Sequence, residues 1–450
     1  MNNPFPSLSR LKEICSIDFH IMTTLLFRGW GVLAGGITII LLPIWLSPSE
    51  QGFYFTFASV LGIQVFFELG LNQIVLQLVS HEIIHLHEDE SGQLTGHAAH
   101  LDRVASIVAL TNRWYAIAAI LFAIVCGVSG IVLFHQKELD LGVTWPHIWV
   151  ILVAITSINL WISPKLAVME GFGKVGHVAR LRLMQSVIGY AVFWLALYLG
   201  AGLWVAFLLP LVAAVFSSYW LRFRAPQLRA LSLRKYSFEN QVNWRADILP
   251  LQWRIGLSWA SGYLIFSLFT PMVFVNQGDI AAGQLGIALA IFASISTIGM
   301  SWISAKVPNF VTLIAHGQRK ALDLLFNQLL VRSTILITIC CIGFLVVLQY
   351  LTYIDLSIVH RIAPLEVLVI LAITTIVNSL IFGMASYMRA HREEPMLAPS
   401  MIVGLLTALA VYFGSKYGVL MMMFMYMLIV IFVSLPWTVF LFLTYYKNKK

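Results

Sequence analysis

Long apolar runs recur along the whole chain, and they constrain its fold more than any other feature of the sequence. A helix needs about 20 apolar residues to cross the roughly 30 Å hydrocarbon core of a bilayer, and twelve runs reach or nearly reach that length. Of the 450 residues, 60% are hydrophobic and only 11% are charged, whereas a soluble domain has about 25% charged residues. The sequence therefore predicts an all-α polytopic membrane protein with about twelve transmembrane helices.

The first run is too long for the roughly 7- to 15-residue core of a signal peptide, and no small-residue cleavage site follows it. We therefore expect an uncleaved first span. The twelve predicted spans are approximately Ile21 to Leu46, Phe53 to Val79, Tyr115 to Phe134, Ile148 to Val168, Met184 to Leu199, Leu203 to Trp220, Ile255 to Val275, Leu285 to Val307, Ile335 to Leu351, Val367 to Ala385, Met396 to Phe413 and Val419 to Leu443.

The basic residues lie in short segments between the apolar runs. A formal charge of +8 would suggest a nucleic-acid partner if the Lys and Arg residues shared one soluble face, but orientation in the bilayer explains them more simply. If the N-terminus is cytoplasmic, the loops on the opposite side hold only Lys137, Arg361 and Lys416. This positive-inside bias predicts that both termini are cytoplasmic and that no nucleic acid binds.

A long basic connection at residues 222–254 divides the chain into residues 1–221 and 255–450. The two halves echo each other: Leu152 to Ile158 resembles Ile370 to Ile376, and Phe27-Arg28 resembles Trp253-Arg254. Because six spans is an even number, both halves would insert in the same orientation, as a parallel repeat. The sequence predicts two six-helix bundles joined by this connection. Chance similarity between apolar helices is the alternative.

Ionisable groups inside the spans need a partner, a watery cavity or a nearby interface, because exposing them to hydrocarbon costs at least about 2.5 kcal/mol. Arg28 in the first span and Glu68 in the second are expected at depths that allow an ion pair. Gln64, Glu68 and Asn72 recur at i, i+4 and i+8, and Gln73 begins a neighbouring stripe. These stripes indicate a face turned to the bundle interior. It could line a hydrophilic lumen or form hydrogen bonds between helices.

Three further bases lie near the predicted cytoplasmic ends of their spans: Lys165, Arg254 and Lys306. The two lysines could extend to the lipid headgroups. If they face inward instead, they join Arg28 and Arg254 in a cationic cavity that would attract a diphosphate.

His81-Glu82-Ile83-Ile84-His85 matches the H-E-x-x-H pattern of zinc proteases. A catalytic zinc ion needs three protein ligands and a water, and no persuasive third ligand is apparent in the following loop. The segment also begins where the second span is predicted to leave the bilayer, whereas proteolysis needs a site that excludes water. The four cysteines show no C-x-x-C spacing. We therefore expect no metal site and no enzymatic activity.

Several stretches in the first two spans resemble a known family. Ser49-Glu50-Gln51-Gly52-Phe53-Tyr54, Phe67 to Gln73 and Ser80-His81-Glu82, with Arg28 and twelve spans, are similar to the Wzx-type polysaccharide flippases of the multidrug/oligosaccharidyl-lipid/polysaccharide (MOP) exporter superfamily. The resemblance covers the whole chain in topology, but its residue-level content lies in these two spans.

The resemblance implies a bacterial inner-membrane protein that moves an undecaprenyl-diphosphate-linked oligosaccharide from the cytoplasmic to the periplasmic leaflet by alternating access. It also implies a role in O-antigen, capsule or exopolysaccharide synthesis, with polymerase and chain-length proteins as partners. We expect no bound cofactor, and the resemblance implies coupling to a proton or sodium gradient. The alternative on the same fold is a multidrug-type exporter, for which we expect carboxylates to dominate the lumen.

Overall fold

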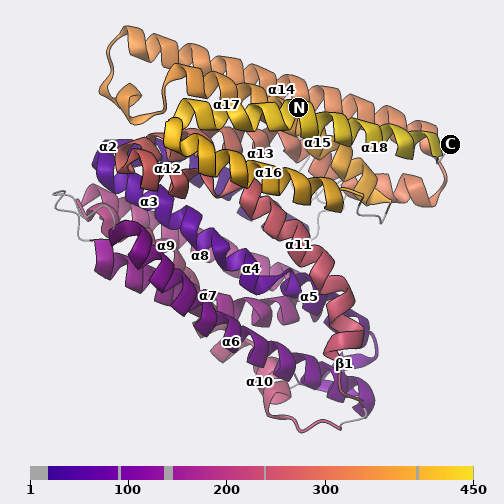
Figure 1. Cartoon of the computed structure of the whole chain (residues 1–450). Helices are drawn as coiled ribbons and strands as arrows, with labels where there is room; N and C mark the ends of the chain where they lie inside the picture. Colours follow the sequence, from indigo (N-terminus) through magenta and orange to yellow (C-terminus); the bar gives the residue numbers. More distant parts are fainter. Residues whose placement is uncertain (1–18, 90–92, 136–144, 238–239, 392–394, 449–450) are drawn as a thin grey trace, which may run out of the picture. The chain divides into compact units, whose positions relative to one another are not determined.

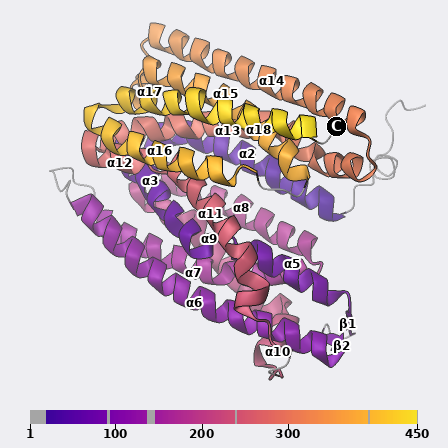
Figure 2. The same cartoon turned by 45° about the vertical axis from the view of Figure 1, so that its right-hand side comes forward.

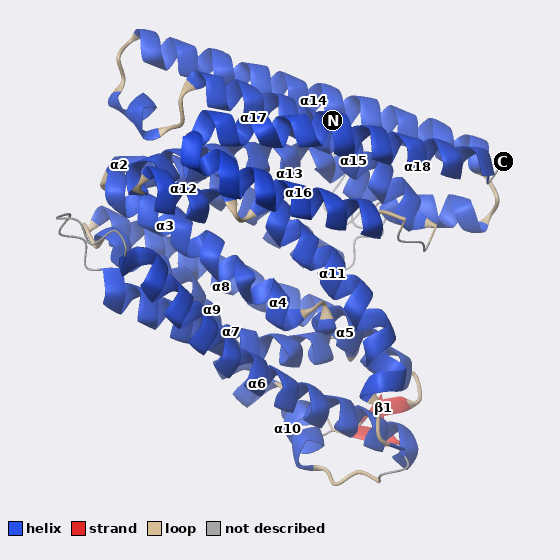
Figure 3. Cartoon of the chain, in the orientation of Figure 1, coloured by secondary structure: helices blue, strands red, loops and turns tan. Residues whose placement is uncertain are grey.

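A computed structural model describes residues 19–89, 93–135, 145–237, 240–391 and 395–448. Lys137, used above in the orientation argument, lies outside these residues. Figure 3 shows that the described chain is almost entirely helical, with one antiparallel hairpin of β1 (Leu86–Glu88) and β2 (Leu94–Gly96). Among the described residues, eleven helical segments are long and apolar enough to span a membrane, and a broken pair makes a twelfth. The prediction of an all-α polytopic membrane protein with about twelve spans is confirmed.

The described residues pack into two compact units, each built from three stretches of chain. The first unit comprises residues up to Gly35, Phe67–Gly127 and His147–Trp253, and the second comprises Gly36–Phe66, Val128–Pro146 and Arg254–Lys450. Several long helices therefore begin in one unit and end in the other. These packing units are defined by contacts, and the division into bundles at residues 222–254 stays a prediction.

The first unit contains the early helices and the basic connection (Figure 1). Its elements, some shared with the second unit, are α2 (Phe19–Trp45), α4 (Val65–Glu68), α5 (Leu71–Ile83), the β1–β2 hairpin, α6 (Ala98–His135), α7 (Trp145–Gly171), α8 (Val175–Tyr198), the 3₁₀ helix η2 (Gly202–Phe207), α9 (Leu208–Arg224), α10 (Pro226–Leu233) and the π-helix η4 (Trp244–Ile248).

The second unit is a bundle in which α13 packs against α3, α14 and α15, as Figures 1 and 2 both show. Its elements are α3 (Pro48–Leu61), the 3₁₀ helix η1 (Gly62–Gln64), most of α11 (Leu249–Phe266), α12 (Phe269–Gln277), α13 (Asp279–Ala315), α14 (Arg319–Tyr353), the 3₁₀ helix η5 (Ser357–Arg361), α15 (Leu365–Ala390), α16 (Leu397–Tyr417), α17 (Val419–Ile429), the π-helix η6 (Val430–Ser434) and α18 (Leu435–Asn448).

The second predicted span is broken rather than continuous. Its helix ends at Glu68, and Leu69 and Gly70 follow with φ values of +47° and +68° before α5 begins. A left-handed residue cannot continue a right-handed helix, and outside glycine the conformation costs about 1–2 kcal/mol. Gly70 adopts it without penalty, whereas Leu69 is strained. The break therefore lies inside the stretch Phe67 to Gln73 that carries the family resemblance.

The basic connection is packed onto the first unit rather than hanging free. Gln227 of α10 is buried and donates to the Glu88 carboxylate at 2.6 Å, while Arg234 pairs with Asp102 of α6 at 2.9 Å. Further along, the Val242 N–H donates to the buried Ser106 hydroxyl at 3.1 Å. The connection thus supplies hydrogen-bond partners for Asp102 and Ser106 near the start of α6.

A glycine contact joins α3 to α13 in the second unit. A Cβ at Gly52 would lie 2.1 Å from the Asp279 carbonyl oxygen, and one at Gly283 would lie 2.8 Å from the Gly52 nitrogen. Real Cβ atoms do not approach this closely, so both positions require glycine for the helices to touch. The Ser49 hydroxyl donates to the Asp279 carboxylate at the same crossing.

Side chains around the same crossing tie α3 to η5. Gln51 donates to the Arg361 carbonyl at 3.0 Å, and the Arg361 guanidinium donates to the Leu46 carbonyl. Burial lowers the pKa of Arg361, an effect that the nearby Glu50 carboxylate opposes. The sequence stretch Ser49 to Tyr54 therefore has a packing role.

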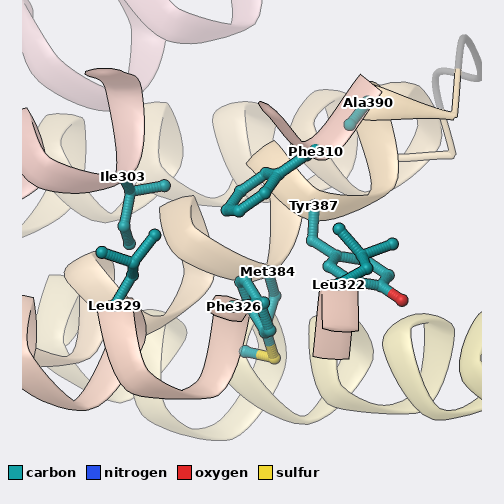
Figure 4. Packing of buried hydrophobic residues seen from close by; sticks show 8 residues of the cluster. All are labelled: Ile303, Phe310, Leu322, Phe326, Leu329, Met384, Tyr387 and Ala390. Atoms are coloured by element: carbon teal, nitrogen blue, oxygen red, sulfur yellow. The ribbon is translucent and has the colours of Figure 1, made fainter. Parts of the chain in front are cut away.

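One hydrophobic cluster of the second unit joins α13, α14 and α15 (Figure 4). Phe326 and Tyr387 lie at its centre, with ring centroids 4.8 Å apart. The Tyr387 hydroxyl extends from the cluster to the Asp323 carboxylate at 2.7 Å. The rest of the cluster is Ile303, Phe310, Leu322, Leu329, Met384 and Ala390.

Candidate functional site

The eight predicted cavity residues are divided between the two units. Five of them belong to the first unit: Arg28, Glu68, Asn72, Gln73 and Lys165. The other three, Gln64, Arg254 and Lys306, belong to the second. Each group is described within its own unit, and their convergence on one lumen stays a prediction.

Asn72 links three helices of the first unit. Its amide nitrogen donates to the Ser163 hydroxyl of α7 at 3.1 Å, and its amide oxygen accepts from the Tyr115 hydroxyl of α6 at 2.8 Å. Tyr115 is fully buried, and the Glu68 carboxylate interacts with it electrostatically. Asn72 therefore forms hydrogen bonds between helices, which is one of the two roles considered for the polar stripe.

Arg28 and Gln73 are exposed, whereas Glu68 is half-buried. Among the described residues, no ion pair joins Arg28 to Glu68. Glu68 is the last residue of α4, and the helix break at the left-handed Leu69 follows it directly. An ionisable group within a span needs a partner, a watery cavity or a nearby interface, because its exposure to lipid is costly.

Lys165 is half-buried, and its ammonium lies 3.1 Å from the centre of the Trp161 ring one turn earlier in α7. A cation over an indole face gains about 0.5–2 kcal/mol. A small cavity of about 20 Å³ adjoins Lys165 and is shared with α6 and α10. The lysine thus has an aromatic partner inside the first unit.

In the second unit, Arg254 and Lys306 are exposed on α11 and α13, and Gln64 is half-buried in η1. Arg254 and Gln64 each interact with other residues of the chain. Lys306 lies one turn after Ile303 on α13, and Ile303 is buried in the hydrophobic cluster whereas Lys306 is exposed.

The HEIIH stretch forms an ion-pair cluster at the end of α5. The Glu82 carboxylate contacts His100 Nδ1 at 2.7 Å and Arg103 Nε at 3.0 Å, and the rings of His85 and His100 stack with centroids 4.2 Å apart. Within the described part of the chain, no group of three or more His, Cys, Asp or Glu side chains could hold a metal ion. The Glu82 carboxylate, which a zinc protease would use as its general base, is bound by His100 and Arg103.

A cavity of about 550 Å³ lies within the second unit, bordered by α3, α11, α12, α13, α15 and α17. We call it the second-unit cavity. Thr374, Thr375 and Asn378 of α15 line one side of it, and Tyr426 of α17 is hydrogen-bonded to Asn378 at 3.0 Å. None of the described residues that line it is formally charged at neutral pH.

These four residues are not among those predicted from the sequence to line a cavity. Thr374 and Thr375 were used only to align the two halves. The available signal was the i, i+4 spacing of Thr374 and Asn378 in an apolar run, which places two polar side chains on one helical face. Tyr426 gives no such signal, because an isolated Tyr among Met and Leu is typical of any span.

Comparisons with known proteins agree with the fold. No family model matches the sequence, and no curated protein sequence matches it. The structure is similar to the inward-facing conformation of a multidrug resistance MATE family transporter of the MOP superfamily, with a TM-score of 0.64, 14% identity and 95% and 96% of the two chains covered.

Two other solved structures give the same result. The lipid II flippase MurJ in an inward closed conformation has a TM-score of 0.64 at 11% identity, with 94% of this chain and 86% of that chain covered. A MATE in the bent conformation has a TM-score of 0.51 at 14% identity, with 95% of each chain covered. The chain therefore has the fold of the MOP-superfamily transporters.

Proposed function

We propose that the protein flips an undecaprenyl-diphosphate-linked oligosaccharide across a bacterial inner membrane by alternating access. The observation that carries the proposal is the set of exposed bases on span helices, Arg28, Arg254 and Lys306. These are suited to an anionic diphosphate, because guanidinium and ammonium groups form charge-assisted hydrogen bonds with phosphate oxygens. The fold similarity to a lipid II flippase supports a lipid-linked substrate.

The same proposal places the protein in O-antigen, capsule or exopolysaccharide synthesis, beside a polymerase and chain-length proteins. Both termini would be cytoplasmic. A proton or sodium gradient would supply the driving force.

Multidrug export is the second function that a specific observation favours, because a multidrug transporter has the same fold. A lipophilic cation would need an acidic partner, since a buried unpaired charge is expensive. Glu68 is the only predicted cavity residue with a carboxylate. The two functions therefore differ in which of Arg28 and Glu68 is essential.

The test uses the purified chain in proteoliposomes loaded with an undecaprenyl-diphosphate oligosaccharide. Translocation is followed by the access of an external glycosidase to the glycan, and ethidium efflux is measured in parallel. We expect Arg28→Ala to abolish glycan translocation with normal insertion, and Lys320→Ala, a matched exposed base on α14, to leave it intact. Ethidium transport that depends on Glu68, with no glycan translocation, would establish the multidrug function instead.

A further inference from the structure

The second-unit cavity has a lining of aromatic rings and neutral polar groups. Its volume of about 550 Å³ falls within the range of small-molecule sites, about 300–1,000 Å³. Six aromatic side chains, one from each of six helices, line it: Phe55, Phe266, Phe269, Phe292, Phe382 and Tyr426. Such sites combine apolar walls with a few polar groups that orient the ligand.

Hydroxyl groups are free to bind a ligand in this cavity. In the described part of the chain, the side-chain hydroxyls of Ser59, Thr270 and Thr375 make no hydrogen bond, although Thr270 and Thr375 are only 3% and 9% exposed. Hydroxyls elsewhere in these spans commonly donate to the carbonyl one turn earlier, as Thr374 does to Ile370. The three free hydroxyls can each donate and accept a hydrogen bond.

Asn378 and Tyr426 form a fixed polar pair in the cavity wall. The Asn378 amide donates to the Tyr426 oxygen at 3.0 Å, and the Tyr426 ring is held edge-on by Phe269 with centroids 5.0 Å apart. This arrangement leaves the Tyr426 hydroxyl proton and the Asn378 amide oxygen available. The pair can therefore offer one donor and one acceptor in a fixed geometry.

The helix is locally irregular beside the cavity. α11 ends at Phe266 and α12 begins at Phe269 within one span, Gln252–Gln277, and Ser267 between them lines the cavity. Pro271 explains the irregularity, because it has no N–H to donate to the carbonyl four residues earlier.

The chemistry of the lining selects among ligands. A cation or a carboxylate would be enclosed without a charged partner, which is costly. A purely apolar ligand would displace water from free hydroxyls and leave them without partners. A pyranose ring fits both features, because its C–H faces can stack on the electron-rich faces of aromatic rings and its hydroxyls can pair with those of the cavity.

We propose that the second-unit cavity binds uncharged pyranose rings of the lipid-linked substrate. The inference rests on the proposed flippase function and adds that glycan and diphosphate are recognised by different groups. The bases hold the diphosphate, and the neutral cavity of the second unit holds the sugar.

The test measures binding to the purified full-length chain in nanodiscs. The probes are undecaprenyl diphosphate carrying a neutral disaccharide and undecaprenyl diphosphate without sugar. In the wild type we expect the disaccharide to tighten binding. Replacement of the polar pair by Asn378→Leu with Tyr426→Phe should weaken binding of the glycosylated probe by about ten-fold, as expected for two lost hydrogen bonds. Binding of the sugar-free probe should not change.

Controls in α15 separate loss of the cavity's polar pair from general destabilisation. Ser379→Ala and Tyr387→Phe remove buried hydroxyls of α15 that do not line the cavity, and both should bind the two probes as the wild type does. Equal affinity of the wild type for the two probes, or equal loss of both in the cavity variant, would overturn the inference. Failure of the wild type to bind either probe would instead refute the flippase function.

Discussion

Single polar residues in these spans have two roles, and Asn72 and Asn378 illustrate them. Asn72 is bonded on both its oxygen and its nitrogen, so its amide connects α5, α6 and α7. Asn378 is bonded through its nitrogen to Tyr426 beside a cavity. The sequence alone cannot separate these roles, because both residues lie on a polar stripe of an apolar helix. Packing against neighbouring helices decides between them.

Substitutions at the Asn72 site should differ in cost. Tyr115→Phe removes one hydrogen bond and should lower the free energy of unfolding by about 1 kcal/mol. Asn72→Leu leaves the fully buried Tyr115 hydroxyl without its partner and should cost more, about 1–3 kcal/mol. Thermal unfolding in detergent measures both. Gln73→Leu, at an exposed neighbouring position, should have little effect, and an equal cost for all three would contradict the assignment.

Glu82→Gln should leave transport intact. Its carboxylate pairs with His100 and Arg103, which are partly exposed, so the loss should reduce stability by about 1 kcal/mol or less. The check is the proteoliposome assay together with a zinc-dependent protease assay. Complete loss of transport, or protease activity that vanishes in this variant, would assign a direct role to Glu82.

At the scale of elements, the positions of the spans could be predicted and their interruptions only in part. Span positions follow from the length of apolar runs, because the bilayer demands that length. The break at Leu69 occurs at a good helix former, where tertiary contacts override local propensity. Gly70 gave a local signal for this break. The irregularity at Ser267 also had one, because Pro271 has no N–H to donate to the carbonyl four residues earlier.

The crossing of α3 and α13 yields a prediction about glycine. Gly52→Ala places a methyl group 2.1 Å from the Asp279 carbonyl oxygen, and backbone cannot yield as a side chain can. We expect a loss of about 1–3 kcal/mol, typical of overpacking, measured by thermal unfolding. Gly262→Ala on α11, where nothing lies within 4 Å, is the matched control and should be neutral or stabilising. An unchanged Gly52→Ala variant would show that the helices do not touch as described.

At the scale of the whole molecule, the sequence predicts two halves, and the contacts define two units with different boundaries. Orientation and repeat arguments depend on the order of spans along the chain. Packing depends on which parts of the helices contact one another, and these contacts cannot be predicted from amino-acid composition. The polar candidates Arg28 and Arg254 could therefore be identified from the sequence, while the partners of each helix could not.

Truncation should reveal how the connection contributes to the first unit. A fragment of residues 1–221 lacks Arg234 and the Val242 N–H, which satisfy the buried Asp102 and Ser106. We expect it to be digested by protease in detergent markedly faster than a fragment of residues 1–253. Arg234→Ala in the longer fragment should raise its rate of digestion part of the way toward that of the fragment of residues 1–221. Equal digestion of the two fragments would show that the connection adds no stability.

The packing of Gln227, Arg234 and Val242 onto the first unit has a consequence for biosynthesis. As the chain is made from its N-terminus, the start of α6 and the β1–β2 hairpin emerge more than a hundred residues before the segment that satisfies them. Until the ribosome has passed Val242, Asp102 and Ser106 must find water or another protein. The early helices can insert in order, but Asp102 and Ser106 of the nascent first unit remain accessible to insertion factors until Arg234 and Val242 bind them.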